Sequence, residues 1–114
     1  MTRCIVAFLM MMGMSCLAHA DVFDLLKAGL AARIQGDFGA AIKFYTEAID
    51  TGSLSDANRA VVLASRGVAY DMIGETDRAI DDFDTAIRLA PDSGTTYIYR
   101  GRAWAKTRIQ PRDR

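Results

Sequence analysis

The chain has 114 residues, of which 51% are hydrophobic and 25% are charged, and its formal net charge is zero. This length fits one small domain, and the composition excludes a largely disordered chain and a strongly basic nucleic-acid-binding protein. The charge is unevenly divided: residues 21–92 carry 13 acidic and 7 basic side chains, whereas residues 93–114 carry 1 acidic and 6 basic. Two interpretations of the basic end stay open, a solvated face and a contact with an acidic partner or anionic lipid.

Residues 1–20 have the three parts of a secretory signal peptide. Arg3 provides a positive start, residues 4–18 are nearly all apolar, and an A-H-A run ends at Ala20. Small residues at the two outer positions of such a run are what a signal peptidase reads. We expect cleavage after Ala20 and a secreted or periplasmic protein. The alternative is a retained membrane anchor, but the apolar run is shorter than the ~20 residues that cross a bilayer.

Every cysteine and histidine of the chain lies in this N-terminal segment, at Cys4, Cys16 and His19. A lipoprotein anchor at Cys16 is the other alternative, but residues 13–15 lack the leucine that usually begins such a motif. Residues 21–114 therefore contain no thiol or imidazole for nucleophilic catalysis, zinc binding or disulfide formation. Calcium-loop and phosphate-loop motifs are also missing. We expect a protein that is not an enzyme and that uses no metal and no cofactor.

Residues 22–55 have the pattern of two amphipathic helices joined by a turn at Gly36, with Asp37 as the N-cap of the second helix. Small residues and one ring recur at helical spacing, which places them on the faces where the helices meet. These positions are Gly29, Ala41, Tyr45 and Ala48.

Residues 60–93 repeat the pattern more completely. Gly74 ends the first helix, and Pro91 cannot continue the second because it lacks an amide hydrogen. The expected packing positions are Gly67, Tyr70, Ala79, Phe83 and Ala86. The opposite, solvated face of the second helix is expected to carry Asp77, Arg78, Asp81, Asp82, Asp84 and Arg88. Asp84 and Arg88 are one turn apart, so we expect a weak surface pair between them.

Both stretches have the same internal spacing, since twelve residues separate Gly29 from Ala41 and also Gly67 from Ala79. A partial third copy over residues 94–107 has Gly101 and Trp104 at the matching positions, 34 residues after Gly67 and Tyr70. This order of small residues, rings and a late proline resembles the tetratricopeptide repeat, a helix–turn–helix unit of about 34 residues.

The first copy departs from that family at three positions, where Leu25, Ala32 and Ser53 replace the usual tryptophan, tyrosine and proline. A polar insertion over residues 51–58 lengthens the spacing between the first two copies to 38 residues. A generic helical hairpin is the alternative to the resemblance.

The resemblance implies an all-α fold, a right-handed α-solenoid of antiparallel helical hairpins with two repeats and one extra helix. The implied domain spans residues 21–107, with repeats at about 22–55, 60–93 and 94–107, followed by a basic C-terminal tail at 108–114. The last helix either caps the stack or belongs to a repeat that is complete in a longer ancestor.

In that family the first helices of successive repeats line a concave groove that holds a peptide or a partner helix. The positions of this chain that match the groove are Phe23, Leu26, Leu30, Arg33, Ile34, Val61, Ala64, Val68, Asp71, Met72, Thr95, Ile98, Arg102 and Lys106. The family's carboxylate clamp of basic and amide side chains is absent, because its positions hold Leu26, Leu30, Ser65, Thr95 and Tyr99.

A mostly apolar groove favours a protein–protein interaction scaffold that binds an apolar or amphipathic peptide or helix. The alternative is a homo-oligomerising structural module, or a fragment of a larger repeat protein without a ligand of its own. Self-association is a serious possibility because a stable stack usually needs three or more repeats. We expect no nucleic acid as a partner, and membrane contact only through an uncleaved N-terminal segment.

Overall fold

The computed structural model describes residues 21–109, and within this range it contains helices and no strand. The helices are α2 (Val22–Ile34), α3 (Phe38–Asp50), α4 (Asp56–Met72), α5 (Thr76–Leu89) and α6 (Gly94–Ile109). The expected all-α fold is therefore confirmed. The expected signal peptide lies outside the described residues, as does most of the expected basic tail, although Arg108 is part of α6.

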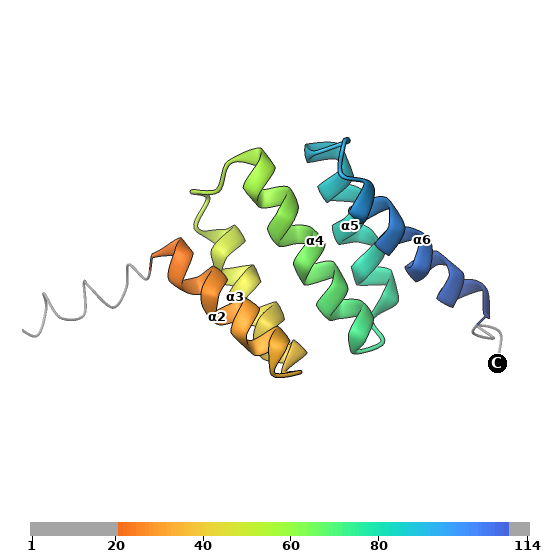
Figure 1. The fold of residues 1–114 in the computed structure, drawn as a ribbon, viewed down its shortest axis with the longest axis horizontal. Helices are drawn as coiled ribbons and strands as arrows, with labels where there is room; N and C mark the ends of the chain where they lie inside the picture. The colour runs from red at the N-terminus through yellow and green to blue at the C-terminus, as the bar shows by residue number, and fades with distance from the viewer. Residues whose placement is uncertain (1–20, 110–114) are drawn as a thin grey trace, which may run out of the picture.

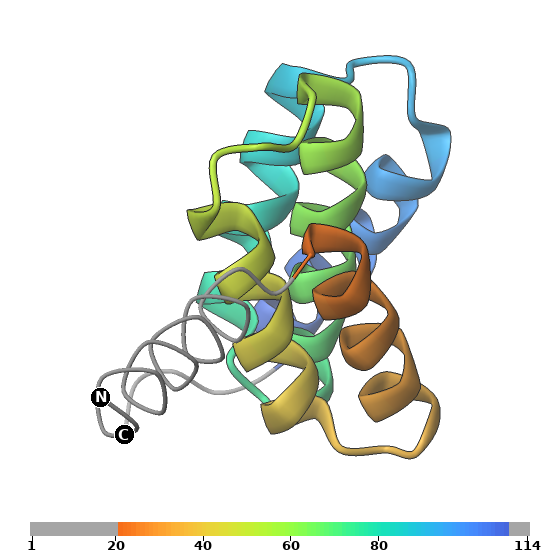
Figure 2. The same cartoon turned by 90° about the vertical axis from the view of Figure 1, so that its left-hand side faces the viewer.

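The helices form two antiparallel hairpins, α2–α3 and α4–α5, that stack side by side (Figure 1). α6 packs against α5 at the end of this stack and touches α4 only slightly. Seen from the side, α2, α4 and α6 form one layer and α3 and α5 form the other (Figure 2). The layer of first helices is the one in which the groove is expected.

Short polar side chains begin three of the helices. Asp21, Asp37 and Ser55 each accept a hydrogen bond from a backbone amide of the first turn, at 3.1–3.2 Å. Each bond satisfies an amide that has no partner within the helix. Gly36 and Gly74 follow the first helix of each hairpin with φ near +80°, a region that L side chains rarely adopt. The expected turns and the Asp37 N-cap are thus confirmed.

Each hairpin is held together by an aromatic ring packed directly over a glycine. A Cβ atom built on Gly29 would lie 2.6 Å from Cε1 of Tyr45, and one on Gly67 would lie 2.7 Å from Cε1 of Phe83. Both rings are almost fully buried, with 4% and 1% of their surface exposed. Only a residue without a side chain leaves room for such a contact, which explains why the two glycines and the two rings share one spacing.

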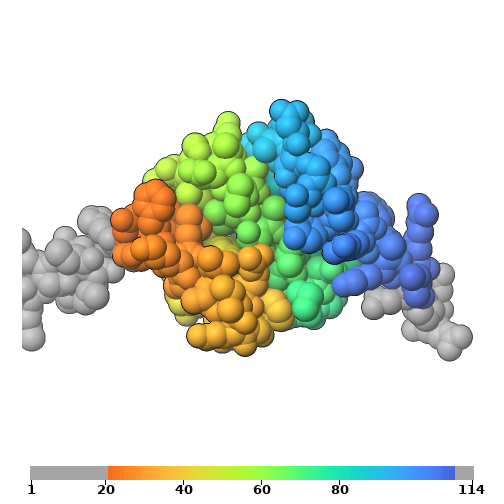
Figure 3. Space-filling view, in the orientation of Figure 1, coloured from red at the N-terminus to blue at the C-terminus, as the bar shows by residue number. Residues whose placement is uncertain are grey.

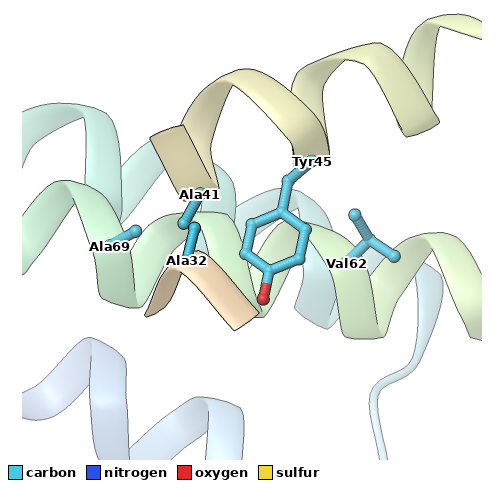
Figure 4. Packing of buried hydrophobic residues seen from close by; sticks show 5 residues of the cluster. All are labelled: Ala32, Ala41, Tyr45, Val62 and Ala69. Carbon is cyan, nitrogen blue, oxygen red and sulfur yellow. The ribbon is translucent and has the colours of Figure 1, made fainter. Parts of the chain in front are cut away.

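The ring of Tyr45 also joins the two hairpins. Figure 4 shows it leaving α3 and lying between α2 and α4, with small side chains around it. Its neighbours in this buried cluster are Ala32, Ala41, Val62 and Ala69. Ala32 stands where the family usually has a tyrosine. In this buried cluster the large side chain is therefore that of Tyr45, and Ala32 packs beside it.

An internal ion pair crosses the second hairpin. Arg66 on α4 donates from Nε and Nη2 to the two carboxylate oxygens of Asp82 on α5, at 2.8 and 2.7 Å. Its third donor, Nη1, reaches Thr46 on α3 at 3.1 Å. The hydrogen bonds to Asp82 raise the pKa of the Arg66 guanidinium further above its already high value. Arg66 therefore ties three helices together at once.

Two expectations for α5 were wrong. Asp82 does not belong to the solvated face, because only 6% of the residue is exposed and its carboxylate is bound by Arg66. Asp84 pairs with Arg100 of α6 at 3.0 Å, while Arg88 donates to Thr85 instead. The packing of α6 on α5 brings a cation to Asp84 from a neighbouring helix, which spacing within α5 alone does not reveal.

We expect Gly67→Ala to destabilise the protein by roughly 1–3 kcal/mol, since the new methyl group overlaps the buried Phe83 ring. Gly101→Ala is the matched control: it lies within α6, where a Cβ meets no atom within 4 Å, so it should stabilise by about 0.5–1 kcal/mol. Urea unfolding followed by circular dichroism at 222 nm measures both. Equal stabilities of the two variants would contradict the ring-over-glycine packing.

The Arg66 guanidinium is partly buried, and removal of Asp82 should leave it without its carboxylate partner. Asp82→Ala is therefore expected to cost roughly 3 kcal/mol. Asp84→Ala removes a carboxylate from a pair that is one third exposed, and is expected to cost less than about 1 kcal/mol. Thermal and urea unfolding of the two variants test the contrast, and a larger loss for Asp84→Ala would refute it.

Candidate partner-binding groove

A hollow of about 280 Å³ lies on the layer formed by α2, α4 and α6. In the space-filling view of Figure 3, α2 and α6 flank a recessed part of α4. The hollow is lined by Arg33, Ala60, Val61, Ala64, Ser65, Val68, Ala90, Ser93, Thr95, Thr96 and Tyr99. Most of its surface is apolar, and its alanines make the floor deep because they carry short side chains.

The structure brings five of the expected groove residues together in this hollow: Arg33, Val61, Ala64, Val68 and Thr95. Val61 is the most accessible of the apolar ones, with 65% of the residue exposed. Val68 also packs against the core cluster around Phe83, so it contributes to folding as well as to the hollow. Like Thr95, Ser65 and Tyr99 stand at positions of the family's carboxylate clamp, and both also line the hollow.

The other expected groove residues lie elsewhere. Leu26 packs against the core around Tyr45. Six of them are exposed on the same three helices but do not line the hollow: Phe23, Leu30, Ile34, Met72, Ile98 and Arg102. The predicted groove is therefore wider than the concave pocket that the structure forms.

Asp71 and Lys106 pair with each other. The Lys106 Nζ lies 2.8 Å from Oδ2 of Asp71, and Oγ1 of Thr76 lies 3.5 Å from the other carboxylate oxygen. Together with Met72 and Ile109 these residues line a second, shallower hollow at the other end of α4. The pair links α4 to α6, two helices that otherwise touch little, and so helps to set the width of the concave side.

Four residues of the hollow were missed from the sequence. Ala60 and Thr96 lie on its first helices, and Ala90 and Ser93 belong to the connection between α5 and α6. Matching the family's groove positions considers only first helices, so it overlooks a connecting loop. The hydroxyls of Ser93 and Thr96 lie 3.0 Å apart, and this contact orders the loop at the start of α6.

Arg33 is the cation of the hollow. Burial raises the pKa of the Tyr45 hydroxyl, and the positive charge of Arg33 offsets part of that shift. A cation beside a small apolar floor and several hydroxyls can hold an apolar side chain together with a neighbouring acceptor group. The described residues contain no cluster of three or more side chains suited to a metal ion.

The part of the chain that the structure describes has no helix that combines the length and the apolar character needed to cross a bilayer.

Comparison with known proteins agrees with the architecture. The family model of the tetratricopeptide repeat matches residues 25–51 and 60–93, which cover most of α2–α3 and of α4–α5. The chain is 38% identical over 81 residues to small glutamine-rich tetratricopeptide repeat-containing protein 2 of Mycosarcoma maydis, a match that covers 70% of this chain and 22% of that protein.

Two further relatives are similar to this chain. A DnaJ homolog subfamily C member 7 homolog of Schizosaccharomyces pombe is 42% identical over 74 residues, covering 64% of this chain and 15% of that protein. A protein SGT1 homolog of Oryza sativa subsp. japonica is 31% identical over 87 residues, covering 76% and 23%. The chain thus spans less than a quarter of the length of these curated relatives. With two matched repeats that account for more than half of its residues, the chain belongs to the tetratricopeptide repeat family.

Proposed function

We propose that this protein is a non-catalytic interaction scaffold whose hollow between α2, α4 and α6 binds an apolar or amphipathic segment of another protein. The observation that carries the proposal is the hollow itself. It stays open and mostly apolar although all the helices around it are packed against their neighbours. Membership of the tetratricopeptide repeat family supports a protein as the ligand.

The lining indicates what kind of segment fits. A volume of about 280 Å³ accommodates one or two apolar side chains rather than a whole helix. Val61 and Val68 would contact such a side chain, while Arg33 and the hydroxyl of Ser65 would bind a polar group next to it. The residues that replace the family's clamp supply no ring of cations, so the ligand does not need a C-terminal carboxylate.

A homo-oligomer is the second candidate function. The helices of the groove layer expose large apolar side chains outside the hollow, including Phe23, Ile34 and Ile98 with 62%, 76% and 57% of the residue accessible. A second copy of the chain could cover them. Light scattering over a range of concentrations separates the two functions, because a concentration-dependent dimer favours the oligomer and a monomer favours the scaffold.

We also propose that the scaffold works outside the cytoplasm, as a secreted or periplasmic protein. The support is the sequence of residues 1–20, with its positive start, its apolar run and its small residues before the expected cleavage site after Ala20.

Val61→Asp should weaken ligand binding at least tenfold, because it places a charge among the apolar side chains that line the hollow. The probe is a set of random 12-residue peptides, displayed on phage, selected on the full chain and then synthesised. Ile34→Asp is the matched control, since it also charges an exposed apolar position but outside the hollow. Fluorescence anisotropy gives the dissociation constants, and circular dichroism checks the fold. Equal affinities for both variants would place the ligand elsewhere.

The full chain expressed in a Gram-negative bacterial host should be found in the periplasm without its first twenty residues. Intact-mass spectrometry would then show a protein that begins at Asp21. Ala18→Lys should prevent this cleavage, because the peptidase needs a small residue at that position. Recovery of the uncleaved wild-type chain from the cytoplasm would refute the proposed location.

A further inference from the structure

Three arginines in the part of the chain that the structure describes are half-buried: Arg33, Arg66 and Arg100. Arg66 binds Asp82 at 2.7 Å, and Arg100 binds Asp84 at 3.0 Å. Arg33 forms no ion pair with any described residue. Taking a guanidinium partly out of water costs free energy unless an acceptor compensates it. Arg33 is therefore a half-buried cation whose acceptor does not come from the described helices.

The hydroxyl of Tyr45 is a second polar group of this kind. It makes no hydrogen bond to a described residue, although only 4% of Tyr45 is exposed. Solvent still reaches its oxygen, because no fully enclosed side-chain oxygen or nitrogen of the described residues lacks a hydrogen bond. Figure 4 shows this oxygen at the tip of the ring, between α2 and α4 and on the side away from α3. An available O–H donor thus faces the layer of α2, α4 and α6.

Arg33 and the Tyr45 hydroxyl lie along the same face of α2. A Cβ built on Gly29 would lie 3.1 Å from Cζ of Tyr45, the carbon that carries the hydroxyl. Arg33 follows Gly29 by four residues, which places it one turn further along that face. Arg33 also lines the hollow. A cation and an O–H donor are therefore brought together where α2 borders the hollow.

A carboxylate matches these two donors. Its two oxygens can accept from a guanidinium and a hydroxyl at once, and hydrogen bonds to an ionised acceptor are stronger than neutral ones. One negative charge balances one guanidinium. A phosphate dianion would instead leave an unpaired charge beside the apolar lining of Val61 and Val68. The donors thus favour an aspartate or glutamate side chain over a phosphate group.

The charges of the groove positions favour an acidic ligand as well. These positions carry Arg33, Arg102 and Lys106 against a single acid, Asp71, and Lys106 already binds that acid at 2.8 Å. A second copy of the chain joined through the same layer would bring like charges together. An acidic segment of another protein would bring opposite ones.

We propose that Arg33 and the Tyr45 hydroxyl form a carboxylate subsite beside the hollow. The partner segment then carries an aspartate or glutamate close to the aliphatic side chain that enters the hollow. This inference rests on the proposed scaffold function and names the chemistry of its ligand. The subsite is distinct from the family's clamp, because neither Arg33 nor Tyr45 stands at a clamp position.

The probes are phage-selected 12-residue peptides, chosen on the full chain and synthesised with amidated C-termini so that only side chains supply a carboxylate. Selection should enrich aspartate or glutamate close to an aliphatic residue. Each acidic peptide is paired with its amide isostere, in which glutamine replaces glutamate or asparagine replaces aspartate. The wild-type chain should bind the acidic peptide roughly tenfold more tightly than the isostere, as expected for hydrogen bonds to a charged group.

Tyr45→Phe is the decisive variant, because Phe83 shows that a ring without a hydroxyl packs as closely over a glycine. Its melting temperature should stay unchanged or rise. Its affinity for the acidic peptide should fall about fivefold, while its affinity for the isostere stays the same. Tyr97→Phe is the matched control, since it removes a hydroxyl from an exposed position of α6 outside the hollow.

Arg33→Gln should remove the preference for the acidic peptide, because it replaces the cation by a neutral amide. Lys43→Gln makes the same change of charge at an exposed position of α3, in the other layer, and should keep the preference. Fluorescence anisotropy gives the preference as a ratio of two dissociation constants. This ratio does not depend on how well the aliphatic side chain fits the hollow.

Two results would overturn the subsite directly. One is equal affinity of the wild-type chain for the acidic peptides and their isosteres. The other is a preference that survives in both Tyr45→Phe and Arg33→Gln. Peptides that Val61→Asp weakens but that show no preference for an acid would refute the carboxylate subsite alone. Peptides that Val61→Asp leaves unaffected would refute the proposed groove function as well.

Two further results would name a different occupant and so contradict the proposal. Residues 1–20 contain no acidic residue, and residues 110–114 contain only Asp113. A higher affinity of Asp113→Asn for the acidic peptide would show that Asp113 fills the subsite. A dimer of the full chain, seen by light scattering and dissociated by Arg33→Gln, would make a second copy the occupant.

Discussion

The close contact between a glycine on one helix and an aromatic ring on the next is the constraint on which this structure depends. A separation that would leave 2.6–2.7 Å between a Cβ and a ring carbon is possible only where the Cβ is missing. The contact sets the distance and the angle between the helices of each hairpin, and the ring of Tyr45 carries it on to the next hairpin. The rings of Tyr45 and Phe83 extend from α3 and α5 onto Gly29 of α2 and Gly67 of α4, so they fill the space between the two layers.

The helices and their packing positions could be predicted from the sequence, because a glycine, an alanine and a ring at regular spacing impose nearly the same local geometry wherever they occur. The burial of Asp82 could not. It depends on Arg66, sixteen residues away on the facing helix, and an aspartate among other aspartates has the pattern of a solvated surface. The pairing of Asp84 with Arg100 was missed for the same reason, since it forms between helices rather than along one.

The candidate site shows a similar division. Three of the five expected residues of α4 line the hollow, Val61, Ala64 and Val68, because the position of a residue in the repeat determines which way its side chain points. Ala90 and Ser93 were not foreseen, because the path of the connection before α6 depends on how that helix packs. The expected groove also included Leu26, which packs instead against the core cluster around Tyr45.

The threefold role of Arg66 has a consequence for how the protein comes apart. Its guanidinium binds Asp82 within its own hairpin and Thr46 in the preceding one. If the α2–α3 hairpin opened alone, Arg66 would keep Asp82 but would lose Thr46, and the buried residues of α4 that pack around the Tyr45 ring would be exposed to water. Separate opening is thus unfavourable, and the two repeats are coupled into a single cooperative unit even though each contacts only its neighbour.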